Sequence, residues 1–138
     1  MSYLIDTCTL SELVRPKPAR SVVEWFGAVA SEALYVSALT LGEIRKGVEK
    51  LPPGRRREQI GSWLEVDLPR WFDGRVLPVD GPLADEWGRL VSRHPRVLPV
   101  IDALLAATCL RHRLAIVTRN VADFDGTGIV VIDPWGSN

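Results

Sequence analysis

Long apolar runs and histidines are scarce in this chain of 138 residues, and each scarcity excludes a class of protein. No segment reaches the roughly 20 apolar residues that a membrane-spanning helix needs, so we expect no membrane span. The first residues lack the basic and apolar regions of a secretory signal. The two histidines, His94 and His112, lie in a turn and at the end of an expected helix, which disfavours catalysis by a histidine pair.

Cysteine is equally scarce, and a net charge of one sign is missing altogether. Cys8 and Cys109 have neither a zinc-ligand spacing nor a neighbouring cysteine, so we expect two free thiols in a reducing compartment, the cytosol. The 17 basic residues balance the 17 acidic residues. This balance disfavours a protein that coats nucleic acid by bulk charge, although it permits a local basic groove.

The length and the hydrophobic pattern predict one α/β domain over residues 1–138. Short apolar segments alternate with amphipathic ones, which is typical of a parallel sheet covered by helices on both faces. Thr9 and Glu12, like Thr40 and Glu43, have the spacing of a helix capping box, so we expect helices to begin there. Strands are expected near residues 2–5, 34–36, 75–77, 114–117 and 129–132.

Aromatic residues are concentrated in a few places. We expect a helix after residue 55 to end near Pro69, leaving Trp71 and Phe72 in a loop. Trp25 and Phe26 are expected on a surface helix, although Trp25, like Trp63 and Trp87, could instead belong to the core. Exposed aromatic residues often mark interfaces, so these residues favour self-association.

The segment from Pro99 to Phe124 is the centre of the predicted fold. Between Val100 and Leu110 the only polar side chains are Asp102 and Thr108, which predicts a helix that is buried almost all round. A carboxylate in its first turn needs a partner, because an isolated buried charge is costly. The partner could be a metal ion, or Asp102 could simply complement the helix dipole.

Four acids follow strand ends or begin helices, where the groups that do chemistry collect in α/β sheets. They are Asp6, Glu43, Asp102 and Asp123. Each has a structural alternative as a turn or capping residue. If they converge, their repulsion requires a cation with oxygen ligands, Mg²⁺ or Mn²⁺.

Four segments carry a specific resemblance. The sequences Leu-Ile-Asp-Thr at 4–7, Leu-Thr-Leu-Gly-Glu-Ile-Arg-Lys-Gly at 39–47, Ile-Asp-Ala-Leu-Leu-Ala-Ala-Thr at 101–108 and Val-Thr-Arg-Asn-Val-Ala-Asp-Phe at 117–124 resemble the signature segments of PIN-domain ribonucleases. Within that family the chain looks most like VapC-type toxins of type II toxin-antitoxin systems. The resemblance implies a three-layer α/β/α domain with a mostly parallel central sheet of four to five short strands.

The resemblance also implies a function and its residues. Asp6, Glu43, Asp102 and Asp123 would form the acidic site for Mg²⁺, for which Mn²⁺ could substitute, and Thr118 and Asn120 would support that site. Such a site cleaves RNA with a metal-activated water. Cys8 departs from the pattern, because many relatives have Asn or Ser there.

Partners are implied in the same way. A cognate antitoxin and an RNA substrate are expected, with a homodimer that joins the antitoxin. Arg119 is the candidate contact to the RNA backbone. The residues expected to contact the antitoxin are Arg55, Arg56, Arg57 and Trp63.

Three alternatives stay open on the sequence. A PIN fold without catalysis would serve as an interaction module. A haloacid-dehalogenase phosphatase requires a second acid two residues after the first, where this chain has Cys8. A receiver domain requires a lysine at a late strand end, where Val131 to Pro134 offers none.

Overall fold

The computed structural model describes residues 1–136 and contains a five-stranded sheet in which all neighbouring strands are parallel. The strand order is β3-β2-β1-β4-β5, so the first strand lies at the centre. This architecture confirms the predicted parallel sheet. The strands are β1 (Tyr3–Ile5), β2 (Leu34–Ser37), β3 (Val76–Leu77), β4 (Ala115–Val117) and β5 (Val131–Ile132).

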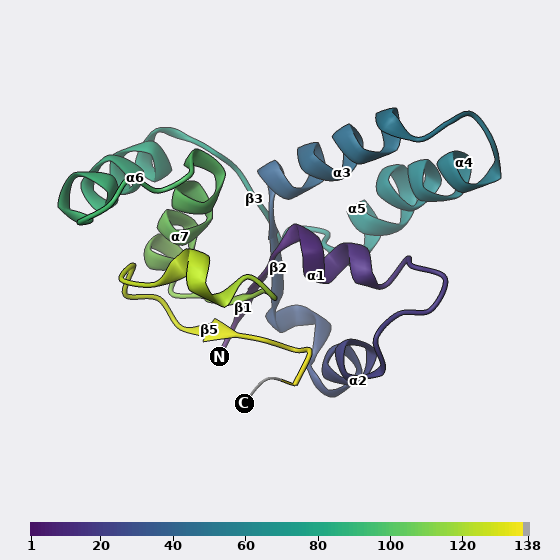
Figure 1. Cartoon of the computed structure of the whole chain (residues 1–138), viewed down its shortest axis with the longest axis horizontal. Coiled ribbons are helices and arrows are strands. Elements are labelled where there is room, and N and C mark those ends of the chain that lie inside the picture. Colours follow the sequence, from purple (N-terminus) through teal and green to yellow (C-terminus); the bar gives the residue numbers. More distant parts are fainter. Residues whose placement is uncertain (137–138) are drawn as a thin grey trace.

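Helices cover both faces of the sheet (Figure 1). The helices on one face are α6 (Gly81–Arg93) and α7 (Val100–His112). The elements on the other face are α1 (Thr7–Glu12), α2 (Arg20–Ala28), α3 (Ala38–Lys50), α4 (Arg55–Ser62), the π-helical segment η2 (Trp63–Asp67) and α5 (Leu68–Trp71). Two short 3-10 helices complete the chain, η1 (Ser31–Ala33) and η3 (Val121–Phe124).

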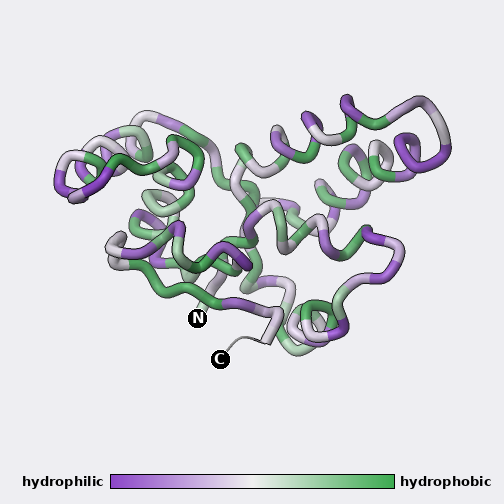
Figure 2. The backbone as a smooth tube through the Cα atoms, in the orientation of Figure 1, coloured by the Kyte–Doolittle hydropathy of each residue, from purple (hydrophilic) through white to green (hydrophobic). Residues whose placement is uncertain are grey.

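Alternation along the strands divides the core into two clusters. Leu4 and Ile116 face α6 and α7, whereas their chain neighbours Ile5 and Val117 face the other helices. Successive side chains of a strand point to opposite faces, so a strand buried on both sides is apolar throughout. Figure 2 shows these apolar strands at the centre of the molecule. Along residues 1–136 the structure has no helix long and apolar enough to cross a membrane.

The predicted central helix is confirmed as α7. Its buried residues include Ala103, Leu105 and Ala106, and its contacts with α6 are extensive. Arg113 ends the helix in the left-handed conformation, with φ of 56°. Asp102 lies at the other end of α7, in the first turn of the helix.

Both predicted capping boxes are wrong. Helix α1 begins at Thr7, because Asp6 at the end of β1 accepts a hydrogen bond from the Thr7 backbone N–H at 2.8 Å. Helix α3 begins at Ala38, where Ser37 at the end of β2 accepts from the Leu39 N–H. The side chains that end the strands cap the helices first, so the later Thr-x-x-Glu pairs are left for other contacts.

The region around Pro69 also differs from expectation. The helix beginning at Arg55 does not end there, because η2 and α5 continue it to Trp71. Pro69 lies in the first turn of α5, where a missing N–H costs little. Phe72 is fully buried, and Trp71 packs between Phe72 and Phe26.

These aromatic residues pack on one another, with Phe72 buried and Trp25, Phe26 and Trp71 half-buried. Ring centroids are 5.3 Å apart for Trp25 and Phe26, 5.6 Å for Phe26 and Trp71, and 4.7 Å for Trp71 and Phe72. Aromatic pairs at this spacing stabilise the fold beyond their buried area. The self-association expected from these residues stays a prediction.

Arg75 ties this stack to the sheet edge. Its guanidinium donates hydrogen bonds to the carbonyl oxygens of Ser31, Leu34 and Trp71, and it lies 5.5 Å from the Phe72 ring centroid. One side chain thus joins η1, β2 and α5. A lysine ammonium cannot reach three carbonyls in the plane that a guanidinium spans.

Replacing Arg75 by Lys is expected to lower the free energy of unfolding by about 1–3 kcal/mol, because the partly buried carbonyls of Leu34 and Trp71 lose their donors. Urea unfolding followed by circular dichroism measures the change. Arg70→Lys on the exposed side of α5 is the matched control and should leave the unfolding midpoint where it is. Equal midpoints for the two variants would contradict this role for Arg75.

Candidate active site

The candidate site lies at the carboxyl edge of the sheet, where the strand order reverses direction. β2 and β3 extend the sheet on one side of β1, and β4 and β5 extend it on the other. Ligand sites of open α/β sheets form in the crevice at such a switch point. Asp6 follows β1 and Thr118 follows β4, so both lie at this crevice.

Asp6 is held rigidly at the crevice. Asp6 is only 8% exposed, and its Oδ1 accepts a hydrogen bond from the Thr7 N–H at 2.8 Å. Its Oδ2 accepts the Thr118 hydroxyl at 2.7 Å. The Thr118 hydroxyl in turn accepts the Asn120 backbone N–H at 3.1 Å. Thr118 therefore contacts Asp6 directly, whereas Asn120 reaches Thr118 through its backbone N–H.

Cys8 adds a weaker contact to the same carboxylate. Its Sγ lies 3.7 Å from Asp6 Oδ2 and 3.6 Å from the Thr118 hydroxyl. Burial, followed by the nearby Asp6 charge, raises the pKa of the Cys8 thiol, against opposing hydrogen bonds that include the Arg119 backbone N–H. The thiol therefore stays protonated and donates, so the departure from Asn or Ser leaves Asp6 with a donor at this position.

Thr7 connects the first acid to the second. Its backbone N–H binds Asp6, and its hydroxyl donates to Glu43 Oε1 at 2.6 Å. Glu43 lies in the second turn of α3 and is half-buried. Sequence reasoning gave Thr7 no role. Thr7 directly follows an acid that ends a strand, and a hydroxyl at that position can reach the next helix. This position could have indicated its role from the sequence.

Three of the four predicted acids line one pocket of about 310 Å³, namely Asp6, Glu43 and Asp102. Thr7, Cys8 and Asn120 complete its polar wall. Asp123 is exposed on η3 and is not part of this lining, although its charge acts on Asp102. The structure therefore brings three acids together and places the fourth at the margin.

The acids perturb each other as close carboxylates do. Burial, followed by the negative charges of Asp123, Asp6 and Glu43, raises the pKa of Asp102. No arginine or lysine forms an ion pair with any of the four within residues 1–136. Unneutralised acids around one pocket favour a cation.

The donor set fits Mg²⁺ or Mn²⁺ held partly through water. In the described part of the chain, no three acidic, histidine or cysteine side chains lie close enough together to enclose a metal ion directly. Mg²⁺ keeps several waters and takes only one or two protein carboxylates directly. A polar pocket lined by three carboxylates and far larger than a bare ion suits such a hydrated cation.

The predicted partner-binding residues lie outside this pocket. A mainly apolar groove of about 390 Å³ runs between α1, α3 and α4, and Thr7 and Glu43 at its end also line the acid pocket. Arg56 and Trp63 line the groove. Arg55 is exposed and is not part of the groove lining.

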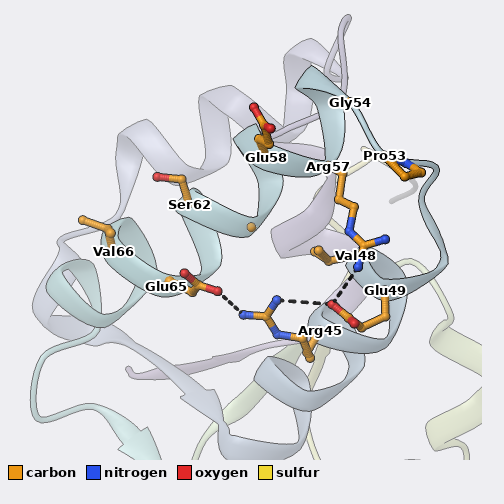
Figure 3. Close-up of a pocket in the computed structure, with 11 residues that line it drawn as sticks. Arg45, Val48, Glu49, Pro53, Gly54, Arg57, Glu58, Ser62, Glu65 and Val66 are labelled. Atoms are coloured by element: carbon orange, nitrogen blue, oxygen red, sulfur yellow. Dashed lines mark hydrogen bonds and ion pairs between the residues drawn. The ribbon is translucent and has the colours of Figure 1, made fainter.

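Arg57 turns away from the groove into a second pocket of about 550 Å³ between α3 and α4 (Figure 3). There it forms an ion pair with Glu49 at 3.3 Å and donates to the Leu51 carbonyl. Arg45 bridges Glu49 and Glu65 in the same network. Arg57 thus already has an acidic partner within the chain.

Comparison with known proteins identifies the class. The family description "PIN domain" matches residues 3–128, and the chain belongs to the PIN-domain family. This membership excludes the haloacid-dehalogenase and receiver-domain alternatives.

The relatives within that family are toxins of toxin-antitoxin systems, as the VapC-type resemblance predicted. The chain is 34% identical to Toxin FitB of Neisseria gonorrhoeae, over 96% of this chain and 97% of that protein. It is 33% identical to VapC ribonuclease Y4jK of Sinorhizobium fredii, over 96% of each. The structure of FitAB bound to an IR36 DNA fragment matches with a TM-score of 0.90 and 31% identity, over 99% of this chain and 97% of that one.

The raised pKa of Asp102 makes stability without metal depend on pH. The folded state disfavours the ionised carboxylate, so stability falls as pH rises from the ordinary aspartate range, near 4, through the raised pKa. Asp102→Asn removes this cost. We expect it to melt no lower than wild type at neutral pH in EDTA, with any gain vanishing in acid.

Asp6→Asn is the contrasting variant. An amide has one acceptor oxygen, so one donor at Asp6 loses its partner, at a cost of about 1–3 kcal/mol. Thermal unfolding at neutral and acid pH separates the two variants. A lower melting temperature for Asp102→Asn at neutral pH in EDTA would contradict the repulsion at the site.

Proposed function

We propose that this chain is a Mg²⁺-dependent endoribonuclease that acts as the toxin of a toxin-antitoxin pair. The observation that carries the proposal is the shared pocket of Asp6, Glu43 and Asp102 at the switch point of the sheet. A relative of similar length, VapC ribonuclease Y4jK, supports the activity.

Each acid has a distinct contribution. Asp6 is fixed by Thr7 and Thr118, so its carboxylate is already oriented before a cation arrives. Asp102 projects from the first turn of α7, where the helix dipole favours a negative charge. Glu43 is oriented by the Thr7 hydroxyl, and Asp123 adds charge from the margin.

When bound, Mg²⁺ lowers the pKa of a coordinated water and neutralises charge on the phosphodiester. Asp6, Glu43 and Asp102 would hold the ion. Attack by water at phosphorus with cleavage of the P–O3′ bond would leave a 5′-phosphate and, once the 3′ oxygen takes a proton, a 3′-hydroxyl. Arg119 at the end of β4 supplies positive charge beside the acids for the RNA backbone.

Asp6→Asn and Asp102→Asn should each lose nearly all metal-dependent RNase activity, because removing one negative ligand weakens an oxygen site directly. Cleavage of total RNA with Mg²⁺, Mn²⁺ or EDTA measures this loss. Asp73→Asn, on an exposed turn away from the pocket, is the control.

Full cleavage in EDTA, or by the Asp102→Asn chain, would overturn the metal-dependent mechanism. Absence of cleavage by wild type with either metal would favour the other candidate, a PIN fold that serves as an interaction module.

The antitoxin is proposed to lie in the groove between α1, α3 and α4. The groove is mainly apolar, ends at the acid pocket and includes Trp63 as an aromatic anchor. A basic side chain from the partner could then reach Glu43 and Asp6 and compete with the metal, since a guanidinium pairs with carboxylates at two points. Arg56 at the groove wall would meet acids on the antitoxin.

Changing Arg55, Arg56 and Arg57 to Glu should slow association with the cognate antitoxin and weaken its salt dependence, while RNase activity of the free chain persists. Among the single changes, Arg56→Glu should have the largest effect, because Arg57 is paired internally and Arg55 lies outside the groove lining. Surface plasmon resonance at several salt concentrations measures the rates, with Arg70→Glu as control. Equal loss of catalysis and association would place the cluster on the RNA path.

A homodimer is also proposed, on different grounds from the aromatic argument. Val97 is 95% exposed and Val100 is 60% exposed. Ile101, which follows Val100 in the chain, lines an apolar hollow with Leu39 and Val79 that also includes Glu43. A second copy on this face would border the acid pocket, so two active sites would share one RNA-binding surface.

A further inference from the structure

Arg119 and Trp135 form a cation–π pair, and Arg119 directly precedes Asn120, which lines the acid pocket. The Arg119 guanidinium carbon lies 5.1 Å from the centroid of the Trp135 ring. The two residues come from different strand ends, since Arg119 follows β4 and Trp135 follows β5. They meet because β4 and β5 are parallel neighbours with their carboxyl ends at the same edge.

The backbone on both sides of the pair is fixed. Thr118 donates its N–H to the Ile132 carbonyl at 2.9 Å, which joins the two strand ends. The Thr118 hydroxyl, one residue before Arg119, lies 3.6 Å from the Cys8 sulfur and donates to Asp6. The Trp135 N–H donates to Asp133 Oδ1 at 2.9 Å and Pro134 is buried, so the turn that carries the indole is anchored.

The pairing leaves the donors of Arg119 available. A cation–π contact uses the flat face of the guanidinium, while its five N–H donors lie in the plane. Arg119 has no carboxylate within ion-pair distance in residues 1–136, unlike Arg45, Arg57 and Arg89, which are all paired. Arg119 is thus held in place with unused N–H donors near the acid pocket, an arrangement that suits binding of a phosphate group.

We propose that Trp135 is a positioning residue for the RNA substrate, holding the Arg119 guanidinium so that it binds a phosphate adjacent to the one cleaved. The proposal rests on the RNase function proposed above. An acidic pocket repels the RNA backbone, so a fixed positive charge at its rim offsets that repulsion. Trp135 restricts the rotamers of Arg119 before RNA binds, so the side chain loses less conformational entropy on binding.

The test measures RNA binding without cleavage. In the Asp102→Asn background with Mg²⁺, fluorescence anisotropy follows a short fluorescein-labelled single-stranded RNA of mixed sequence across a range of salt concentrations. Arg119→Ala should weaken binding by about tenfold and reduce the salt slope by about one phosphate contact. Trp135→Leu leaves the Arg119 charge in place but removes the aromatic face beneath it, and should weaken RNA binding about two- to fivefold. Trp135→Phe keeps an aromatic face and should retain most of the RNA affinity.

Non-additivity separates positioning from a merely structural role. If Trp135 acts through Arg119, the double variant Arg119→Ala with Trp135→Leu should bind as Arg119→Ala alone does. Arg111→Ala, at the exposed end of α7 on the opposite edge of the sheet, is the charge-matched control. Melting temperatures of all variants identify any that fail to fold. If Trp135→Leu fails to fold, Trp135→Phe replaces it in the comparison with the parent chain.

The outcomes are distinct. Additive losses, or Trp135→Leu binding RNA as the parent does, overturn the assignment of Trp135. If the variants bind RNA normally but bind the antitoxin more weakly, Arg119 and Trp135 belong to the antitoxin interface. That result would also overturn the RNA-positioning role of Trp135. If the parent chain neither binds this RNA nor, with Asp102 restored, cleaves it, the RNase proposal and this assignment both fail.

Discussion

The hydrogen bonds to the Asp6 carboxylate are the interaction on which the site depends. They join the end of β1, the start of α1 and the end of β4 through one side chain. Burying a carboxylate is costly unless donors satisfy it. Here the donors are supplied by the fold itself, so the orientation of the first acid is set by the packing of two central strands and not by a flexible loop.

The fold was largely predictable because its strands and central helix have unambiguous patterns. Leu4, Ile5, Ile116 and Val117 are buried on both faces, so a short apolar run is what the sheet requires. The convergence of Asp6, Glu43 and Asp102 followed from one rule, that parallel strands present their carboxyl ends at one edge. Local patterns were sufficient for these features since each strand and helix bears its own signal.

What the sequence did not reveal depends on contacts between distant residues. The Thr9 and Glu12 pattern was read as a cap, yet Thr9 donates to the Val117 carbonyl and Glu12 accepts the Ala19 N–H. Phe72 lies in the turn after α5, as expected, but its complete burial was not predictable, because the residues that pack with it in the core, such as Leu10 and Val36, come from other elements. The marginal position of Asp123 was equally hidden, since spacing alone does not give the path of η3.

The central position of β1 has a consequence for biosynthesis. Asp6 and Thr118, which share a hydrogen bond, are 112 residues apart in sequence. The first strand leaves the ribosome long before its neighbour β4, and contacts of such long range form late in folding. The acid pocket is therefore assembled only when nearly the whole chain has been made, so an incomplete product of this gene would lack an ordered site inside the cell that makes it.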